Sequence, residues 1–299
     1  MAVEFGVVVP AGPVHGAVDR LLDDMDRVVE ALPLSFKSIW MTDHFFWDTR
    51  PTHECWTVLA FAAARWSHLH VGPIVMGQGY RNPALTAKMA STLQVLSGGR
   101  LIMGIGAGWK EDEYHAYGYP YPSAGVRVGQ LEDTLEIFKR LWTQPGAVTY
   151  HGAHYQIENA YCEPKPQPIP LLVGGRGDKV LRLAARYADI WNLPDSHFDH
   201  FNERLNVLKG HCADVGRDSS SIRLSWFGRI SVARTQEEAE ARSNGKWTAR
   251  NAFVGTPEQV RDQLKQFTDV GVNLFIYEIL GGFDSDVLRY TIDEVIAKV

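Results

Sequence analysis

The sequence lacks the features that mark a secreted, membrane-spanning or nucleic-acid-binding protein. Its three cysteines, Cys55, Cys162 and Cys212, are odd in number and far apart, so they predict neither a disulfide framework nor a zinc knuckle, and we expect buried thiols. No stretch reaches about 18 uninterrupted apolar residues, and Met1–Val9 lacks the basic and then apolar segments of a signal peptide. The net charge of −5 provides no basic surface for nucleic acid. We therefore expect a soluble, cytoplasmic protein that binds neither membranes nor nucleic acid.

The chain also lacks a linker, internal repeats and low-complexity tracts. No run rich in proline, glycine and serine divides its 299 residues, and 45% of them are hydrophobic, which is enough for one large core. Barrels of alternating strands and helices reach about 250 residues as one unit. We therefore expect one domain over residues 1–299.

Eight apolar segments alternate with helical ones along the chain. The first, Val3–Val9, is nearly continuous in apolar residues, as in a parallel strand that is buried on both faces. Because such strands alternate with helices, the order predicts an α/β protein of the (β/α)8 TIM-barrel class with insertion loops. A small hairpin at Val148–Ile157 is one expected insertion. The other strands are predicted in the first half of Ile39–Trp47 and at Leu69–Met76, Leu101–Gly108, Pro170–Gly174, Ala188–Asn192, Arg223–Val232 and Val272–Ile279.

Apolar spacing and end signals predict the helices between these strands. Leu85, Met89, Leu93 and Leu96 recur at helical spacing and should form one buried face. Thr256 and Pro257 are expected as the cap and first residue of a later helix. Further helices are predicted at Gly16–Leu32, Glu54–Trp66, Leu131–Trp142, Asp178–Tyr187 and Phe198–Val215, and along Leu288, Ile292, Val295 and Val299.

One strand end carries the groups best suited to catalysis. Asp43 and His44 follow an apolar strand and precede Phe45, Phe46 and Trp47. A carboxylate beside an imidazole can hold one tautomer and shift its pKa, and aromatic rings offer flat surfaces to a planar ligand. Functional groups of a barrel lie where strands end and loops begin. The pair is therefore a candidate acid–base group; the alternative is that Asp43 and His44 only hydrogen-bond a loop.

Two glycine-rich turns follow other strand ends. Residues 174–177, Gly-Gly-Arg-Gly, lead directly into a helix, so their N–H groups could bind a phosphate; the alternative is a tight turn without a ligand. Residues 104–108, Gly-Ile-Gly-Ala-Gly, are not the spaced dinucleotide fingerprint, but such glycines could let a flat ligand approach the backbone. Four tyrosines in the next loop predict either a lid over a substrate or the packing of that loop. They are Tyr114, Tyr117, Tyr119 and Tyr121.

Pro73 is unusual in a central strand. Proline donates no hydrogen bond to a neighbouring strand and usually marks an edge or a bulge. A bulge at Pro73-Ile74-Val75 would push main chain into the barrel lumen, as occurs at ligand sites. His68 and His70 lie at the beginning of the same strand without an acidic cluster, so no metal site is expected.

Motifs along nearly the whole chain resemble those of a known superfamily. They are Thr42-Asp43-His44-Phe45, Arg81-Asn82-Pro83, residues 96–101, residues 104–109, Arg127 with Leu131-Glu132, Tyr150-x-Gly152-x-x-Tyr155, Pro164-Lys165-Pro166, Gly174-Gly175 and Gly255-Thr256-Pro257. With them the chain resembles the luciferase-like monooxygenase superfamily, and within it the oxidoreductases that use the deazaflavin coenzyme F420.

This resemblance implies where a deazaflavin would bind. Members carry a non-prolyl cis peptide in a bulge of the third strand, which backs the ring. The first glycine turn would contact the ring or its ribityl chain, and the second would contact the phosphate. The residues implied to bind the cofactor are Asp43, Pro73, Ile74, Val75, Gly106, Ala107, Gly108, Gly174, Gly175, Arg176 and Gly177.

The resemblance also implies an activity, namely hydride transfer between coenzyme F420 and a small organic substrate. His44 would act as acid or base at the substrate oxygen, Asp43 would orient it, and Trp47 would lie over the substrate. In relatives that oxidise glucose 6-phosphate a Glu follows the third glycine, where this chain has Trp109, which disfavours a sugar phosphate. A homodimer is implied as well.

Two other functions stay open on the sequence. An FMN-dependent monooxygenase, which takes reduced flavin from a separate reductase, would use the same barrel. A barrel that binds a flavin-like or other phosphate ligand without catalysis would be a carrier or sensor, and the Asp43-His44 pair at a strand end is the argument against it.

Overall fold

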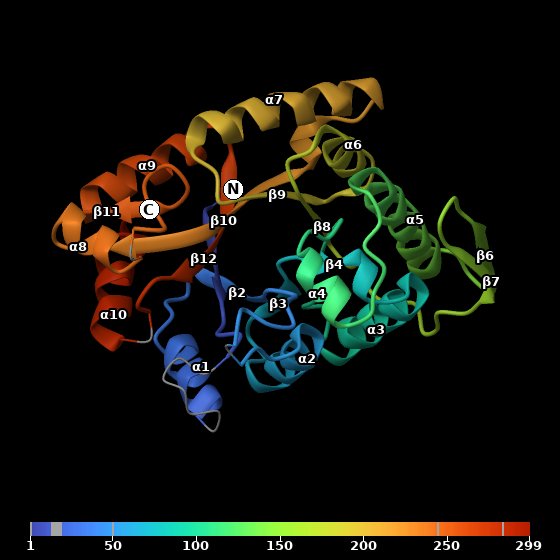
Figure 1. Cartoon of the computed structure of the whole chain (residues 1–299), viewed down its shortest axis with the longest axis horizontal. Coiled ribbons are helices and arrows are strands. Elements are labelled where there is room, and N and C mark those ends of the chain that lie inside the picture. The colour runs from blue at the N-terminus through green and yellow to red at the C-terminus, as the bar shows by residue number, and fades with distance from the viewer. Residues whose placement is uncertain (1, 13–19, 50, 244, 283) are drawn as a thin grey trace.

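A ring of parallel strands occupies the centre of the molecule, and helices surround it (Figure 1). The computed structural model describes residues 2–12, 20–49, 51–243, 245–282 and 284–299. Over these residues the parallel strands are β1 (Glu4–Val8), β2 (Phe36–Met41), β3 (His70–Pro73), β4 (Met76–Gly77), β5 (Met103–Gly106), β8 (Leu171–Gly174), β9 (Ile190–Pro194), β10 (Arg223–Val232), β11 (Phe253–Gly255) and β12 (Val272–Ile279).

The strand order is that of a closed barrel. Neighbouring strands run β3-β2-β1-β12-β10-β9-β8-β5-β4, and β11 pairs with β10 outside this path. A parallel bridge between Val71 of β3 and Leu101, just before β5, closes the ring. Because β3 and β4 are two parts of one interrupted strand, eight barrel positions are filled in the described residues, and the predicted (β/α)8 fold is confirmed.

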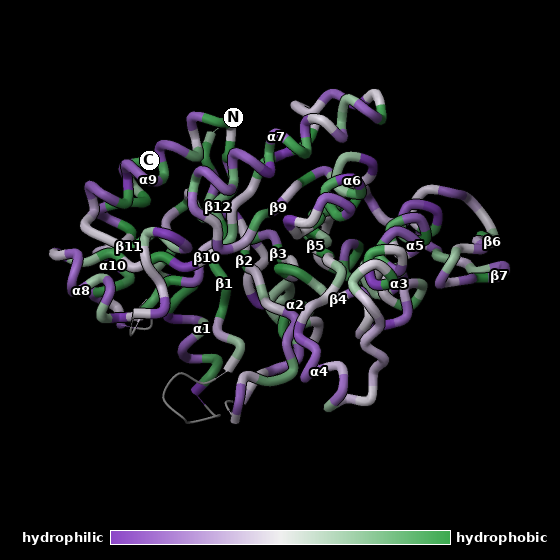
Figure 2. Tube along the Cα trace, turned by 45° about the horizontal axis from the view of Figure 1, so that its top comes forward, coloured by the Kyte–Doolittle hydropathy of each residue, from purple (hydrophilic) through white to green (hydrophobic). Residues whose placement is uncertain are grey.

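Helices cover the outside of this ring. Figure 2 shows apolar residues concentrated on the central strands, while the surrounding helices alternate between polar and apolar faces. The helices are α1 (Leu21–Glu30), α2 (Cys55–Arg65), α3 (Pro83–Leu96), α4 (Glu111–Ala116), α5 (Ala124–Thr143), α6 (Asp178–Tyr187), α7 (Phe198–Asp214), α8 (Gln236–Ala241), α9 (Pro257–Asp269) and α10 (Ser285–Glu294), with short 3-10 turns at Gln78–Tyr80, Ser219–Ser221 and Ile296–Lys298.

The strands are apolar on both faces because each face packs against its own layer. A cluster inside the barrel includes Trp40, Leu172, Phe227 and Ile276, which fill the lumen below its open end. A larger cluster lies between the strands and the helices. This double burial explains the nearly continuous apolar runs that predicted parallel strands.

Several element boundaries match the prediction closely. The predicted β10, β12 and α6 coincide with the observed elements, and α9 begins at Pro257 with Thr256 as its cap. The hairpin insertion is also confirmed, as β6 (Val148–His151) and β7 (Gln156–Ala160). Of the helix predicted from Gly16, the described part begins at Leu21, and residues 13–19 lie outside the described residues.

One predicted helix face is wrong, and the face predicted for the last helix is correct at Leu288, Ile292 and Val295 and wrong only at Val299. On α3 only Leu93 of the four predicted residues is buried, whereas Leu85 and Leu96 are exposed. The buried side of α3 consists largely of small residues such as Ala87, whose carbonyl accepts a hydrogen bond from Trp142 Nε1 of α5 at 3.0 Å. Small side chains let the two helices approach closely, so the leucines face outward. At the end of the chain Val299 is likewise exposed.

The remaining expectations concern cysteines and membranes. Cys55, Cys162 and Cys212 are free, buried thiols, as predicted. In the part of the chain that the structure describes, no helix has the length and apolar character needed to cross a bilayer.

Candidate active site

The predicted site residues meet at one end of the barrel. Asp43 and His44 follow β2, the first glycine turn follows β5, and the second follows β8. Because all these strands run parallel, their carboxyl ends open on the same face. A cavity on this face is lined by His44, Val75, Gly108 and Trp109, among other residues. The structure therefore brings the predicted residues together at the end of the barrel where the sequence places them.

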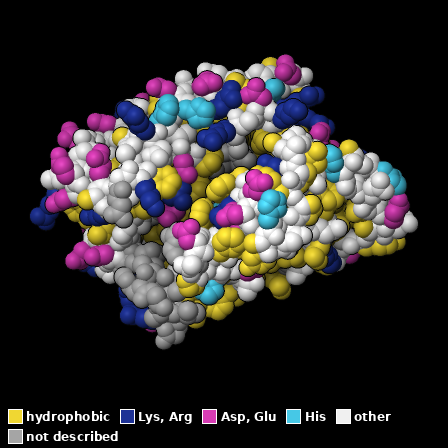
Figure 3. Space-filling model, in the orientation of Figure 1, with side chains coloured by type: hydrophobic (Ala, Val, Ile, Leu, Met, Phe, Trp, Pro, Cys, Tyr) yellow, Lys and Arg dark blue, Asp and Glu magenta, His cyan; other side chains and the backbone are white. Residues whose placement is uncertain are grey.

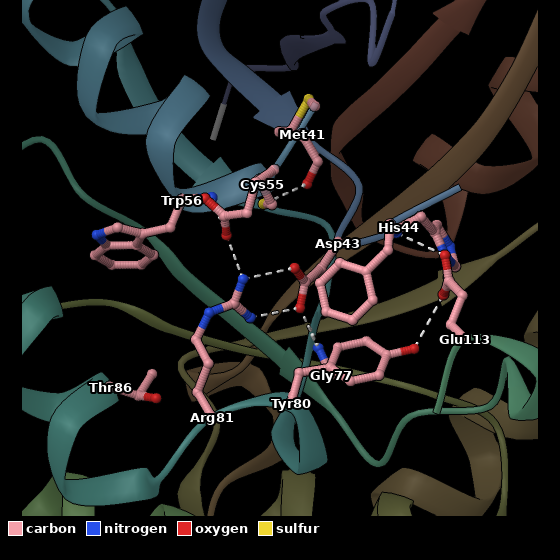
Figure 4. Close-up of polar contacts among 12 residues, drawn as sticks. Met41, Asp43, His44, Cys55, Trp56, Gly77, Tyr80, Arg81, Thr86 and Glu113 are labelled. Carbon is pink, nitrogen blue, oxygen red and sulfur yellow. Dashed lines mark hydrogen bonds and ion pairs between the residues drawn. The ribbon is translucent and has the colours of Figure 1, made fainter. Parts of the chain in front are cut away.

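Glu113 of α4 is the carboxylate that contacts His44. Its Oε2 lies 2.9 Å from His44 Nδ1 and accepts a hydrogen bond from Tyr80 Oη at 3.0 Å. Its Oε1 accepts hydrogen bonds from the backbone N–H groups of Phe45 at 2.6 Å and Phe46 at 3.1 Å. Figure 4 shows His44 and Tyr80 converging on this one side chain. Glu113 therefore ties α4 to the loop after β2 and fixes the His44 ring.

These contacts determine the charge of Glu113 and the tautomer of His44. Burial would raise the pKa of the fully buried Glu113, but the hydrogen bonds from His44 and from the N–H groups of Phe46 and Phe45 outweigh it, so the pKa lies below its ordinary value. An ionised carboxylate only accepts hydrogen bonds, so His44 Nδ1 carries a proton. Burial and the nearby Glu113 also raise the pKa of Tyr80, which keeps its phenol a donor. In neutral His44 the nitrogen free to exchange a proton is therefore Nε2.

Asp43 has a different partner from the one we expected. Its buried carboxylate accepts hydrogen bonds from Arg81 Nη1 at 2.9 Å and Nη2 at 3.1 Å, and from the backbone N–H of Gly77 at 3.0 Å. Figure 4 shows Arg81 directed at the Asp43 carboxylate. Arg81 also pairs with Glu54, the residue that caps α2. The prediction that Asp43 orients the His44 ring is therefore wrong, because its oxygens are engaged by Arg81 and by β4.

The bulge predicted at Pro73-Ile74-Val75 is present. The peptide bond between Ile74 and Val75 is cis, and β3 ends at Pro73 while β4 begins at Met76. A Cβ atom built on Gly106 would lie 2.8 Å from Val75 Cγ2, and one built on Gly174 would lie 2.9 Å from Val75 Cγ1. Glycine is therefore required at both positions, because the Val75 side chain occupies the space between β5 and β8.

The rest of the two glycine turns lies near this bulge. Gly108 has a positive φ of 78°, which suits glycine, and Ala107 packs against the apolar layer around the barrel. Gly175 has a φ of 146° and donates its N–H to Asn192 of β9 at 3.1 Å. Gly177 is the N-cap of α6 and forms no side-chain cap, so the first N–H groups of that helix lack this partner. Arg176 follows Gly175 in the same turn.

Two tryptophans cover the His44 ring. The ring centroid of Trp47 lies 4.7 Å from that of His44, and the centroid of Trp109 lies 5.6 Å from it. Lys110, which is largely buried, places its Nζ 4.3 Å from the Phe46 ring and 5.2 Å from the Trp47 ring. Trp47 therefore lies beside His44, and Trp109 adds a second ring that is 63% exposed. The expected position of Trp47 over a substrate stays a prediction.

The tyrosines after β5 mainly pack against other aromatic residues of the loop and do not form a lid over the cavity. Tyr114 is buried on α4, and its ring centroid lies 4.4 Å from that of Tyr80. Tyr121 donates a hydrogen bond to the Trp109 carbonyl at 2.8 Å, and Tyr117 stacks on Phe45 at 4.3 Å. Of the two interpretations of this loop, the packing of an irregular segment fits these contacts.

Glu113 and Arg81 are the site residues that sequence reasoning missed. The sequence predicts a loop over residues 111–116, whereas the structure shows them as α4. Three acidic residues in succession, Glu111, Asp112 and Glu113, are typical of the beginning of a helix. Arg81 belongs to a motif that supported the family resemblance, but nothing in its sequence context pointed to Asp43.

Comparison with known proteins identifies the family of the chain. The family model described as luciferase-like monooxygenase matches residues 3–250. The chain belongs to the luciferase-like monooxygenase family. Among its relatives, an F420-dependent glucose-6-phosphate dehydrogenase of Intrasporangium calvum is 36% identical, and the aligned region covers 88% of this chain and 93% of that protein.

Solved structures show the same luciferase-like fold. An F420-dependent secondary alcohol dehydrogenase, solved with an F420-acetone adduct, has a TM-score of 0.84 at 18% identity and covers 99% of both chains. The coenzyme F420 dependent tetrahydromethanopterin reductase of Methanopyrus kandleri has a TM-score of 0.81 at 17% identity and covers 100% of this chain and 99% of that one. At these identities the likeness of both structures shows the fold alone.

Proposed function

We propose that this protein is an F420-dependent oxidoreductase that transfers a hydride between coenzyme F420 and a small organic substrate. The relative with 36% identity is named for coenzyme F420, and so are the two structures described above. The observation that carries the proposal is the position of His44, which lines the cavity beside the Val75 bulge while Glu113 holds its Nδ1. A flat cofactor against the bulge would place its reactive face toward this imidazole.

The backbone around the bulge fits a planar ring. Pro73, Ile74 and Val75 form a wall at the carboxyl end of the barrel, and Gly106 and Gly174 on the flanking strands carry no side chain that would block it. Asp43 supports this wall, since its hydrogen bond to the Gly77 N–H joins the end of β2 to β4 just after the bulge. In this proposal Ala107 and Gly108 lie along the ring or its ribityl chain.

The turn at Gly174–Gly177 would hold the cofactor phosphate. Its backbone leads into α6, a ten-residue helix whose first N–H groups have no side-chain cap. The partial positive charge of a helix N-terminus favours an anion there, and Arg176 adds a full positive charge in the same turn. Gly175 and Gly177 allow the phosphate oxygens to approach the main chain closely.

His44 is the proposed acid–base group, and Glu113 is its positioning residue. When bound, the deazaflavin supplies or accepts the hydride. His44 Nε2 then gives a proton to the substrate oxygen in reduction, or takes one from it in oxidation. Glu113 keeps the proton on Nδ1, so that Nε2 is the exchanging atom. Trp47 and Trp109 limit the access of water to this atom and would pack against the substrate.

A paired binding experiment tests the proposal. The purified protein is titrated with F420 and, separately, with FMN, and tryptophan fluorescence quenching reports binding. We expect tight binding of F420 and weak binding of FMN. The reverse order would favour a monooxygenase that takes reduced FMN from a reductase, and binding of neither cofactor would contradict both functions.

Three finer properties stay predictions, the first from the family resemblance and the other two from the composition and charge of the sequence. These are a homodimer, a cytoplasmic location and the absence of a nucleic-acid partner. Light scattering of the purified protein measures the first directly.

A further inference from the structure

The barrel mouth has a second polar wall, opposite the His44 side. Phe227 of β10 and Ile276 of β12 belong to the apolar cluster inside the barrel. Side chains alternate along a strand, so the residues two positions further on, Arg229 and Glu278, face the same lumen. The two are also register partners in the sheet. They therefore lie above the apolar floor, at the open end.

Both terminal nitrogens of Arg229 are engaged by neighbouring carboxylates, and its Nε is buried without a hydrogen-bond partner among the described residues. Its Nη1 donates to Asp195 Oδ1 at 3.0 Å and Oδ2 at 2.8 Å, and its Nη2 lies 2.9 Å from Glu278 Oε2. The ring of Trp247 stacks on the guanidinium, with its centroid 4.2 Å from Cζ. Asp195 follows β9 directly. The cation of this wall is therefore held by groups of the protein and is not presented to a ligand.

The two carboxylates are more open than the arginine. The Asp195 and Glu278 side chains are 31% and 43% exposed, against 17% for Arg229. Two carboxylates face one guanidinium, which leaves one negative charge in excess at the mouth. Arg176 also acts on Asp195, but its charge belongs to the turn proposed to hold the cofactor phosphate. In Figure 3 the surface is hollowed between the side of β10 and the side of α4, with charged side chains along the rim.

We infer that Asp195 and Glu278 are specificity-determining residues, which exclude anionic substrates and select an uncharged substrate that carries a hydroxyl group. An anion at the mouth would meet the excess negative charge, and the terminal nitrogens of Arg229 are already paired with the two carboxylates while its Nε is buried. A hydroxyl group of an uncharged substrate, in contrast, can donate a hydrogen bond to either carboxylate. This inference rests on the proposed function and assigns the substrate class of the same site. It is independent of Trp109, which lies across the mouth.

The test uses inorganic phosphate as the anionic probe. Phosphate is titrated by calorimetry into the protein loaded with F420, so that the turn at Gly174–Gly177 is already filled. The wild type is compared with Asp195→Asn and Glu278→Gln, which remove one charge each with little change of shape. Because Glu278 is the more exposed residue, its variant is the safer one for folding. Glu158→Gln, on the distant hairpin strand β7, is the matched control.

We expect phosphate to bind each wall variant about tenfold more tightly than the wild type or the control, because each variant removes a repulsive charge and releases part of Arg229. Equal phosphate binding by wild type and both wall variants would overturn the inference, whether that binding is strong or undetectable. A wild type that does not bind F420 would contradict the proposed function instead. The difference in phosphate affinity between the wild type, the control and the wall variants, measured on the unloaded protein, would then still test the wall, because phosphate at the Gly174–Gly177 turn would bind all of them alike.

Discussion

The carboxylates on the two sides of the barrel mouth differ in burial and in pairing. On the His44 side, Glu113 is fully buried and accepts four hydrogen bonds, and Asp43 is enclosed by Arg81 and Gly77. On the Arg229 side, Asp195 and Glu278 remain partly exposed and leave one negative charge in excess. Buried, fully paired groups hold a fixed geometry, whereas the charges of exposed groups attract or repel a ligand that enters the cavity. The first side is therefore suited to chemistry and the second to recognition.

This difference also separates two carboxylates that are neighbours at the His44 side. Glu113 contacts the imidazole itself, while Asp43 supports the backbone next to the bulge. Substitution of Glu113 should therefore affect proton transfer, and substitution of Asp43 should affect chiefly the stability of the barrel end. The predictions below test this division.

The largest effect is expected for His44→Ala. Without the imidazole no group is placed to exchange a proton at the substrate oxygen, and general acid–base catalysis contributes about 10²–10⁴-fold to turnover. F420 affinity should stay within a few fold, because backbone holds most of the cofactor. Steady-state turnover and fluorescence titration measure the two quantities. His68→Ala, an exposed histidine at the opposite end of the barrel, should leave both unchanged. Normal turnover of the His44 variant would remove this residue from the mechanism.

Asp43→Asn should cause the next largest effect, on stability. The change leaves Arg81 with only the more exposed Glu54 as a partner, so the cost should be at most about 3–5 kcal/mol, that of a fully broken buried pair. Urea denaturation measures the free energy of unfolding. The more exposed pair of Asp26 with Arg65 is the control, since Asp26→Asn should cost less than about 1 kcal/mol. Similar losses in the two variants would mean that the Asp43 pair is not special.

Glu113→Gln should reduce turnover by about 10–100-fold, less than the loss of His44 itself. The amide no longer fixes the proton on Nδ1, but the imidazole remains in place. The pH profile of turnover should also shift, which a purely structural role would not cause. Glu111→Gln, on the same helix and exposed, is the matched control. An unchanged pH profile with reduced stability would assign Glu113 a structural role only.

The smallest predicted effect is a pH dependence of stability. The pKa of Glu113 is lower in the folded protein than its ordinary value of 4.5, so its contribution is complete above that pH and is lost as the pH falls through the folded pKa. The difference in unfolding free energy between wild type and Glu113→Gln should therefore shrink below about pH 4.5. Urea denaturation over a pH series measures it, and a constant difference would contradict the assignment.

The fold could be predicted well from the sequence because its signals are local. The apolar run of Arg223–Val232 and the helix start at Thr256 and Pro257 each lie within one element, and the structure shows both as predicted. The buried face of α3 was predicted wrongly from its leucines, because a large apolar side chain does not by itself show which face of a helix packs against a neighbouring element. Leu85 and Leu96 face outward, and the smaller Ala87 is buried.

The site could be predicted only as far as its local motifs reach. Asp43 and His44 are adjacent in the sequence, which suggested that they pair with one another. Their actual partners are distant, since Glu113 lies 69 residues beyond His44 and Arg81 lies 38 residues beyond Asp43. No spacing rule connects residues so far apart, because the fold of the barrel alone brings them together. The wall of Asp195, Arg229 and Glu278 could not be predicted from the sequence for the same reason, because its residues lie in or directly after β9, β10 and β12.

The most direct test of the account is the paired titration of the purified protein with F420 and FMN. Tight quenching by F420 with weak quenching by FMN is the predicted result, and it would assign the site to hydride transfer without oxygen. Preferential binding of FMN, or binding of neither cofactor, would contradict the account.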